Sequence, residues 1–475
     1  MTTKERIKSL LLAVLVSSSI ILTGLIWFDK KLWPDGYDFF SVYSETFIGR
    51  FFSKLSDKNE QALNINDTGA LKSIFAPRTA MLSYDDGSRI NYNITQPAGE
   101  EITKQINTAI SKALAESSQS EVSETEWQNS LMSKGIFADY SVPVSFQAIS
   151  VFLNGQSPDF EIMDTFDKMC INLKAATSTS VPIFFRNSSS GKHVVMYAPM
   201  NSNSFEQILS SSSSASQFNL SYSFELNLDK RVEGAGENHQ KIVLDSYILL
   251  PLNSVKLSVI DKTYIDMRNS DLLGEFLETF NLNLNTARKL VQADDTVLYV
   301  NSNSTLTLGN NGYIEYAPSV SSKGIKIGEE NSVTTAAAGS AKIIDNLLRY
   351  AGIDQSTTLY ISSPLLENSD GEYTFTFDYV FAGNPIASDT HGLEVEVKNG
   401  YITSLRANLK SYYLLDAGKE REPLELIDEL YSKLSSNNEN ITIDELYFGY
   451  YDSSLPMTLS WQAKANKSEE VITVK

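Results

Sequence analysis

The sequence predicts an α+β protein in which a single N-terminal transmembrane helix precedes a multi-domain body of antiparallel sheets with packed helices. Three observations predict this class. One long uncharged apolar run stands near the N-terminus, and the remaining chain mixes helix-like stripes with strand-like runs joined by tight turns. The strands and helices do not follow a βαβ rhythm, which favours antiparallel pairing.

Residues 9–28, SLLLAVLVSSSIILTGLIWF, have the length and composition of a membrane-spanning helix. Such a helix needs about 20 mainly apolar residues to cross a hydrocarbon core of roughly 30 Å. Trp27 and Trp33 are suited to the outer interface. A cleavable signal peptide has a shorter apolar core and small residues at its cleavage site. Here Asp29 and Lys30 follow the run directly, so we interpret it as an uncleaved anchor.

The orientation of the anchor follows mainly from the size of the body. Residues 1–8 form a short basic tail, which we expect to stay in the cytoplasm, although the positive-inside bias is weak. Long domains translocate largely regardless of their charge. We therefore expect a single-pass protein of the cell membrane, with residues 29–60 as a stalk and an extracytoplasmic body after it.

Composition excludes some partners and points to a compartment. The net charge of −19 argues against nucleic acid, because phosphate binding uses clustered Lys and Arg. It also argues against a body lying flat on anionic lipid. Cys170 is the one cysteine of the chain, so no intrachain disulfide forms, and we expect it to be a small buried hydrophobic residue. An exterior body without disulfides behind a short basic anchor fits a Gram-positive bacterium.

The first predicted exterior domain covers residues 61–209 and begins with a hairpin. Within residues 74–95, two strand-like runs flank Asp86-Gly87, which is a strong hairpin signal. A helix follows, since apolar residues recur at every fourth position. The positions of this stripe are Ile102, Ile106, Ile110 and Leu114.

The second half of this domain is predicted to be strands. Residues 143–154 indicate one strand, and residues 181–187 and 192–199 indicate a pair around a Ser-Gly turn. The serine run at 210–214 has no apolar period and marks a domain boundary.

The predicted central domain, residues 217–330, alternates like strands, with a short helix around Leu272 and Phe280. Asn311-Gly312 marks a hairpin within it.

The predicted C-terminal domain covers residues 335–475. Its first helix spans 335–353 and stops at Gly352, a residue type that ends helices. Several strands follow, with a hairpin turn at Asn399-Gly400, before Pro423 opens a second helix. Two further strands close the chain.

A search for chemistry finds no catalytic, cofactor-binding or metal-binding residues. The three histidines, His193, His239 and His391, are far apart, and no zinc, nucleophile-elbow or phosphate-loop motif occurs. We expect an ordinary surface or edge role for His193 and solvated loop positions for the other two. Asp85-Asp86-Gly87 and Asp370-Gly371 lack the alternating oxygen ligands of a calcium loop, so we read them as turns.

The anchor itself holds the candidate contact residues. Ala13, Ser17 and Gly24 fall near one face of the predicted helix. Small residues let a second helix approach closely, and hydroxyl groups can bond across the contact. An equally good reading is that the serines only lower the hydrophobicity of a plain anchor.

Three segments stand out in order along the chain: the opening KERIKSLLLAVLV…LIW, the hairpin LKSIFAPRTAMLSYDDGSRINYNI and a long C-terminal run. Together they resemble the YycH family, membrane-anchored regulators of the essential cell-wall two-component system of Firmicutes. The opening is similar to the signal-anchor of that family, and the hairpin is similar to its first exterior hairpin. YTFTFDYVFAGNPIASDTHGLEVEVKNGYITSLRANL is similar to the C-terminal module, in which the step Gly383-Asn384-Pro385 precedes strands with an Asn-Gly turn. This last module also looks PepSY-like, as in the related YycI protein.

The resemblance implies a function and partners. Members of the family are not enzymes, and they pair with a YycI-like sister protein and a sensor histidine kinase through transmembrane helices, restraining or tuning kinase output. It therefore implies a regulator with no cofactor. Two other functions stay open: a passive exterior module that binds a peptide or glycan, and a hydrolase acting on the cell wall.

Overall fold

The computed structural model describes residues 77–474, except 93–96, 117, 155–159, 213–219, 231–241, 329–331, 354–355, 365, 367–369, 435–440, 453–455 and 467–470. The predicted anchor, stalk and helix-contact residues lie outside this part. In the described part the fold is α+β with extensive antiparallel sheets, as predicted. No described helix combines the length and apolar character needed to span a membrane.

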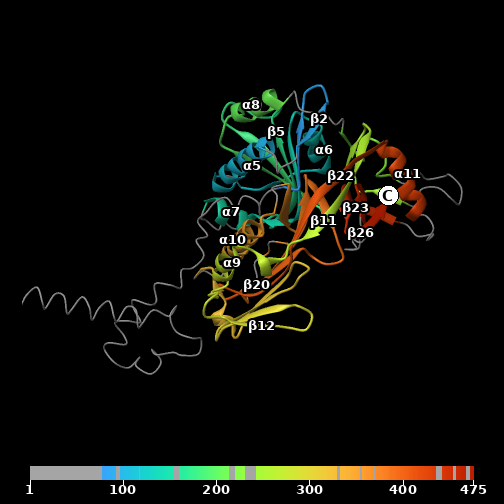
Figure 1. The fold of residues 1–475 in the computed structure, drawn as a ribbon. Coiled ribbons are helices and arrows are strands. Elements are labelled where there is room, and N and C mark those ends of the chain that lie inside the picture. The colour runs from blue at the N-terminus through green and yellow to red at the C-terminus, as the bar shows by residue number, and fades with distance from the viewer. Residues whose placement is uncertain are drawn as a thin grey trace, which may run out of the picture.

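Seven helices occur in the described residues, and they cover different parts of the sheets (Figure 1). They are α5 (Pro97–Glu116), α6 (Glu124–Leu131), α7 (Phe146–Asn154), α8 (Asn203–Ser212), α9 (Leu273–Thr279), α10 (Val333–Ala351) and α11 (Pro423–Leu434). Two short 3-10 turns accompany them, η3 (Met267–Asn269) and η4 (Ser321–Lys323).

A seven-stranded sheet forms the N-terminal part, in the order β2-β1-β4-β5-β6-β7-β3. Its strands are β1 (Thr79–Ser83), β2 (Arg89–Tyr92), β3 (Ser120–Glu121), β4 (Gly135–Ser145), β5 (Thr165–Asn172), β6 (Val181–Asn187) and β7 (Lys192–Ala198). Alternate residues point to opposite faces, so each face has its own core. Leu82 and Ile136 face the core that contains α5, whereas Met81 and Phe137 face Trp127 of α6.

A larger sheet runs β12-β13-β14-β15-β21-β20-β18-β19-β23-β25-β26, with β16, β17 and β9 added to β21, β18 and β23. Its strands are β9 (Ile242–Leu244), β12 (Arg288–Val291), β13 (Val297–Val300), β14 (Ser304–Leu308), β15 (Tyr313–Pro318), β16 (Ile325–Lys326), β17 (Thr357–Ile361), β18 (Glu372–Phe381), β19 (Asn384–Ala387), β20 (Leu393–Lys398), β21 (Tyr401–Asn408), β23 (Ile441–Tyr451), β25 (Ser460–Ala465) and β26 (Val471–Val474). β23 pairs in parallel with β9 and β19, and the other pairs are antiparallel.

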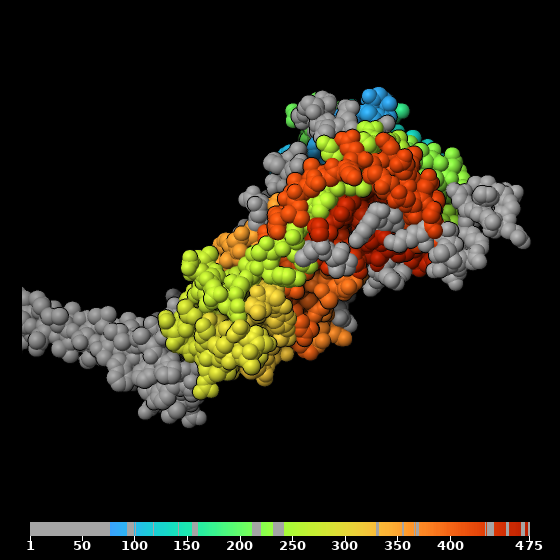
Figure 2. Space-filling model, turned by 45° about the vertical axis from the view of Figure 1, so that its right-hand side comes forward, coloured from blue at the N-terminus to red at the C-terminus, as the bar shows by residue number. Residues whose placement is uncertain are grey.

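Two smaller sheets complete the strands. β8 (Leu220–Tyr222) pairs with β10 (Leu249–Pro251), and β11 (Val255–Tyr264) pairs with both β22 (Lys410–Arg421) and β24 (Met457–Thr458). The long ribbon of β11 and β22 crosses one face of the molecule, visible in Figure 2 as adjacent yellow-green and orange bands. Strands from the predicted central and C-terminal domains thus share sheets, and the predicted domain boundaries stay predictions.

The predicted turns are confirmed by their backbone angles. Gly87 and Gly312 have φ of +82° and +78°, and Asn399 and Gly400 have φ of +51° and +77°. Gly312 is required for a second reason, since a Cβ there would lie 2.3 Å from the Leu409 carbonyl oxygen. Gly352 ends α10 in the left-handed conformation, with φ of +62°.

The strand predicted at residues 143–154 is wrong over most of its length. β4 ends at Ser145 and α7 occupies the rest. Ser145 begins the helix, because its hydroxyl accepts a hydrogen bond from the Ala148 amide at 3.3 Å. The apolar residues of SFQAISVFLN also have helical spacing, with Phe146 and Ile149 both buried against the first core.

Candidate functional site

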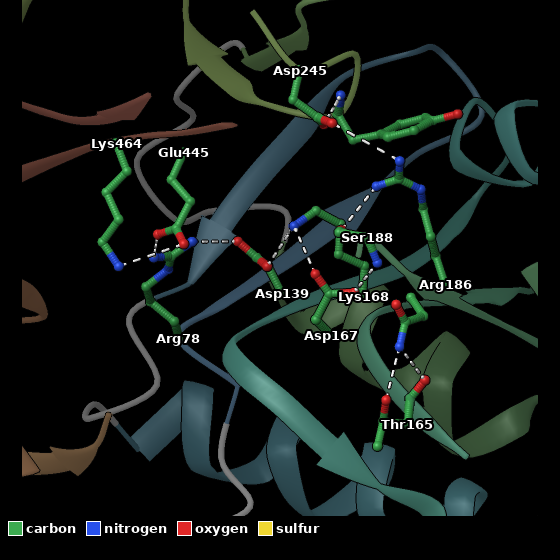
Figure 3. Close-up of polar contacts among 12 residues, drawn as sticks. Arg78, Asp139, Thr165, Asp167, Lys168, Arg186, Ser188, Asp245, Glu445 and Lys464 are labelled. Atoms are coloured by element: carbon green, nitrogen blue, oxygen red, sulfur yellow. Dashed lines mark hydrogen bonds and ion pairs between the residues drawn. The ribbon is translucent and has the colours of Figure 1, made fainter. Parts of the chain in front are cut away.

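Arg78, just before β1, lies between carboxylates that belong to two different sheets (Figure 3). Its Nη2 is 2.8 Å from Oδ2 of Asp139 on β4, and its Nη1 is 3.1 Å from Oε2 of Glu445 on β23. The guanidinium also lies over the Tyr447 ring, 5.0 Å from its centroid. Planar guanidinium groups suit such sites because they donate in two directions at once.

Each carboxylate already has a partner on the neighbouring strand of its own sheet. Asp139 stands opposite Lys168 of β5, with Oδ1 and Nζ 3.1 Å apart. Glu445 stands opposite Lys464 of β25, with Oε1 and Nζ 3.6 Å apart. Arg78 therefore connects two cross-strand ion pairs. We call these five residues the ionic joint.

The charges of the ionic joint support one another. Burial opposes ionisation of Asp139, but Lys168 and Arg78 outweigh it and lower the pKa of this carboxyl. The same balance holds at Glu445. Burial raises the pKa of this carboxyl, but the charges of Arg78 and Lys464 together have the larger effect, and the pKa is lowered overall. Burial alone would lower the pKa of Lys168, yet the Asp139 charge raises it. The joint is therefore fully ionised near neutral pH.

A second polar group continues from the joint along the first sheet. Arg186 of β6 lies over the Tyr247 ring, with Cζ 4.2 Å from its centroid, and its Nη2 is 3.9 Å from Oδ2 of Asp245. Its Nε donates to Nε2 of His193, the opposite residue on β7, at 3.2 Å. These contacts hold the segment between β9 and β10 against the seven-stranded sheet.

The surface or edge role predicted for His193 is wrong. Only 7% of the residue is exposed, and its ring lies 5.7 Å from that of Trp127. Burial and then the Arg186 charge lower the pKa of His193, while Glu124 opposes them. The ring stays neutral because it must accept a hydrogen bond from a cation. His391 is half-exposed and bonded to Asp378, and His239 lies outside the described residues.

A third charged group surrounds Asp452, directly after β23. This carboxylate is 1% exposed and contacts the ammonium groups of Lys262 and Lys410, the latter at 2.7 Å. The Tyr412 hydroxyl lies 3.3 Å from it. The two lysines come from β11 and β22, so Asp452 fastens the ribbon of these strands to the end of β23.

Cys170 is buried, as predicted, and its Sγ donates to the Ser130 carbonyl at 3.4 Å. Burial raises the pKa of its thiol to about 12, so it is not a reactive thiolate. The Asp86-Gly87 site is a turn in which the carboxylate accepts from Ser88, as predicted. Among the described residues, no group of His, Cys, Asp or Glu is arranged to hold a metal ion.

Comparison with known proteins gives a likeness in fold. No family model and no curated protein matches the sequence. The crystal structure of YycH from Bacillus subtilis matches with a TM-score of 0.53 and 13% sequence identity, over 85% of this chain and 97% of that one. The chain has the YycH fold. At this identity the YycH likeness concerns the fold alone, and at that level the predicted resemblance is confirmed.

The likeness in fold says nothing about the predicted helix-contact residues. Ala13, Ser17 and Gly24 lie outside the described residues and stay predictions. The groups that the structure brings together, the ionic joint and the Asp452 cluster, were not predicted, because their members come from distant segments. The sequence held one partial signal, the lysines at 168, 262 and 464 within strand-like runs, where a cation needs a partner if it faces inward.

Proposed function

We propose that the protein is a non-enzymatic, membrane-anchored regulator that restrains a sensor histidine kinase of a cell-wall-controlling two-component system. The observation that carries this proposal is the YycH fold, which extends over 85% of the chain. The anchor at residues 9–28 and the segments that resemble the YycH family support it from the sequence. A YycI-like sister protein is the second proposed partner.

The proposal assigns separate tasks to anchor and body. The anchor contacts the transmembrane helices of the kinase, and the extracytoplasmic body determines how strongly it does so. The ionic joint suits such a body, because it makes two sheets respond together rather than separately. The PepSY-like character of the C-terminal module is part of the same proposal.

Replacing residues 9–28 by an unrelated spanning helix tests the anchor contact. Expression from a promoter controlled by the response regulator reports kinase output, and protease accessibility in intact cells checks export. We expect the exchange to release the kinase. Unchanged output with normal export would show that the anchor sequence is not the contact.

A single substitution sharpens this test. Ser17→Leu places bulk on the face shared with Ala13 and Gly24, whereas Ser19→Leu places it about 200° around the helix. Both changes add the same hydrophobicity. We expect Ser17→Leu, but not Ser19→Leu, to abolish crosslinking between the anchor and the kinase. Equal effects of the two substitutions would contradict contact through one specific helix face.

A further inference from the structure

β12 is the terminal strand of the large sheet, and it lies at the end of the molecule opposite α8 (Figure 1). β13 is the one described strand that pairs with it. All four residues of β12, Arg288, Lys289, Leu290 and Val291, are exposed. The backbone groups on its outer side are therefore open to another strand.

The apolar core face of the sheet continues onto β12 without cover. Val297 of β13 is 6% exposed, yet Val291, directly opposite it on the same face, is 64% exposed. Leu290 on the other face is 46% exposed. Two aliphatic side chains at the end of a strand edge thus lie in water, although Val297 opposite Val291 is buried and Leu298 opposite Leu290 is partly buried.

The other half of β12 is cationic in a chain with a net charge of −19. Arg288 forms no ion pair with any described residue. The Lys289 ammonium lies 5.9 Å from the centre of the Tyr299 ring, and no described carboxylate bonds to it. These two charges are therefore available to carboxylates of a partner.

We propose that β12 is a docking edge for an extended protein segment that adds to the sheet as an antiparallel strand. Cross-strand neighbours determine which segment fits. Opposite Val291 and Leu290 it needs two aliphatic residues, and opposite Lys289 and Arg288 it needs two acidic ones. Read in its own direction, the partner carries the order aliphatic, aliphatic, acidic, acidic. Main-chain hydrogen bonds hold the strand and the side chains select it.

The acidic turn after β12 argues against an anionic lipid surface as the occupant. Asp294 and Asp295 follow within four residues of Val291, and both would face the same negative surface. A strand that pairs with residues 288–291 can end before this turn. This docking edge does not depend on the proposed kinase partner.

A fluorescent peptide, Thr-Val-Val-Glu-Glu-Thr, tests the proposal with the full-length protein in nanodiscs of neutral lipid. We expect saturable binding by anisotropy, and at least tenfold weaker binding to the double variant Arg288→Glu, Lys289→Glu. The matched control, Lys256→Glu with Lys419→Glu, makes the same charge change on exposed positions of β11 and β22 and should leave binding unchanged.

Two further peptides separate strand addition from simple charge attraction. The same peptide with every backbone amide methylated keeps its charges but cannot pair as a strand, so we expect it not to bind. Thr-Val-Val-Lys-Lys-Thr should not bind either. Three outcomes would each overturn the proposal. They are equal binding of the methylated and unmethylated peptides, an equal loss of affinity in both double variants, and no binding of Thr-Val-Val-Glu-Glu-Thr to the native protein.

An alternative role for cations on an edge strand is to prevent self-association without binding a partner. If that were their role here, the Arg288→Glu, Lys289→Glu variant would bind the acidic peptide as well as the native protein does. That outcome, too, would overturn the docking edge. Light scattering of the same samples shows whether the variant has self-associated.

Discussion

Arg78 and Glu445 are separated by 367 positions in the sequence, yet Nη1 of the arginine lies 3.1 Å from Oε2 of the glutamate. The contact joins a seven-stranded sheet near the N-terminus to a strand near the C-terminus. It is one of two bonds that a single guanidinium makes to carboxylates on different sheets.

Replacing Arg78 should destabilise the whole body. Arg78→Met keeps the aliphatic bulk but leaves Asp139 and Glu445 without their shared partner. Removing one member of a fully buried ion pair costs about 3–5 kcal/mol, so we expect a loss of at most about 3 kcal/mol for these partly buried pairs. We expect a matching fall in the free energy of unfolding, measured by pulse proteolysis in urea. Lys398→Met, which removes an exposed pair with Glu372, should cost less than about 1 kcal/mol. Equal effects would mean that the joint adds nothing.

Mild acid should weaken the contact at His193. Its pKa is lowered in the folded protein, so the unfolded chain binds a proton more readily. Stability is then fully present above the unfolded pKa, about 6.5, and falls as the pH drops below it. We expect the melting temperature to decrease from pH 7 to pH 5.5, and His193→Gln to flatten this decrease. His391→Gln is the control, and an unaltered pH profile in His193→Gln would contradict the assignment.

The carboxylates of the ionic joint should respond at lower pH. The folded pKa values of Asp139 and Glu445 lie below their ordinary values of 3.8 and 4.5. Their contribution is present above those values and is lost as the pH falls through the lower folded pKa values. We expect acid unfolding below about pH 4 in the native protein. Arg78→Met should unfold at a higher pH, as followed by far-UV circular dichroism, and coincident transitions would rule out the joint as the cause.

Asp452 should tolerate no loss of charge. Asp452→Asn leaves the ammonium groups of Lys262 and Lys410 without an anion, and an uncompensated buried charge costs about 3–5 kcal/mol. The melting temperature should drop sharply. Asp389→Asn is a suitable control, because Asp389 is exposed and its carboxylate accepts a hydrogen bond from the Tyr451 hydroxyl, not from a buried cation. A triple change of Asp452, Lys262 and Lys410 to apolar residues should recover much of the loss.

Two glycines in hairpins should differ in their response to alanine. Both Gly87 and Gly312 have positive φ, which costs a residue with a Cβ about 1–2 kcal/mol. Gly87 has open space around it, whereas a Cβ at Gly312 would meet the Leu409 backbone. Gly312→Ala should therefore be the more destabilising in thermal melts. Equal costs would show that the strain of positive φ, which the two positions share, and not the close approach at Gly312 determines the cost.

Local sequence signals predicted much of this fold, whereas contacts between distant segments could not be predicted from the sequence. The turns at Asp86-Gly87 and Asn399-Gly400 follow from residue chemistry that acts over a few positions. α6 was not predicted, although the sequence contains its capping box. In this box the Ser123 hydroxyl and the Glu126 carboxylate each accept a hydrogen bond from the other residue's backbone amide. That signal could have identified the helix.

The ionic joint shows why the rest could not be predicted. Asp139 and Lys168 become neighbours only once β4 and β5 are in register, and Arg78 meets Glu445 only once both sheets are complete. No spacing in the sequence encodes these meetings. β12 is a similar case, because its open edge depends on the order of the strands in the sheet.

The position of Arg78 has a mechanical consequence. It immediately precedes β1, so residues 1–77 enter the body at the same point that fastens the two sheets. Tension applied along that segment would act on β4 and β23 at the same time. It would not separate a single strand from the edge of a sheet. A pull from the N-terminal side would therefore load both sheets together through the two bonds of this one guanidinium.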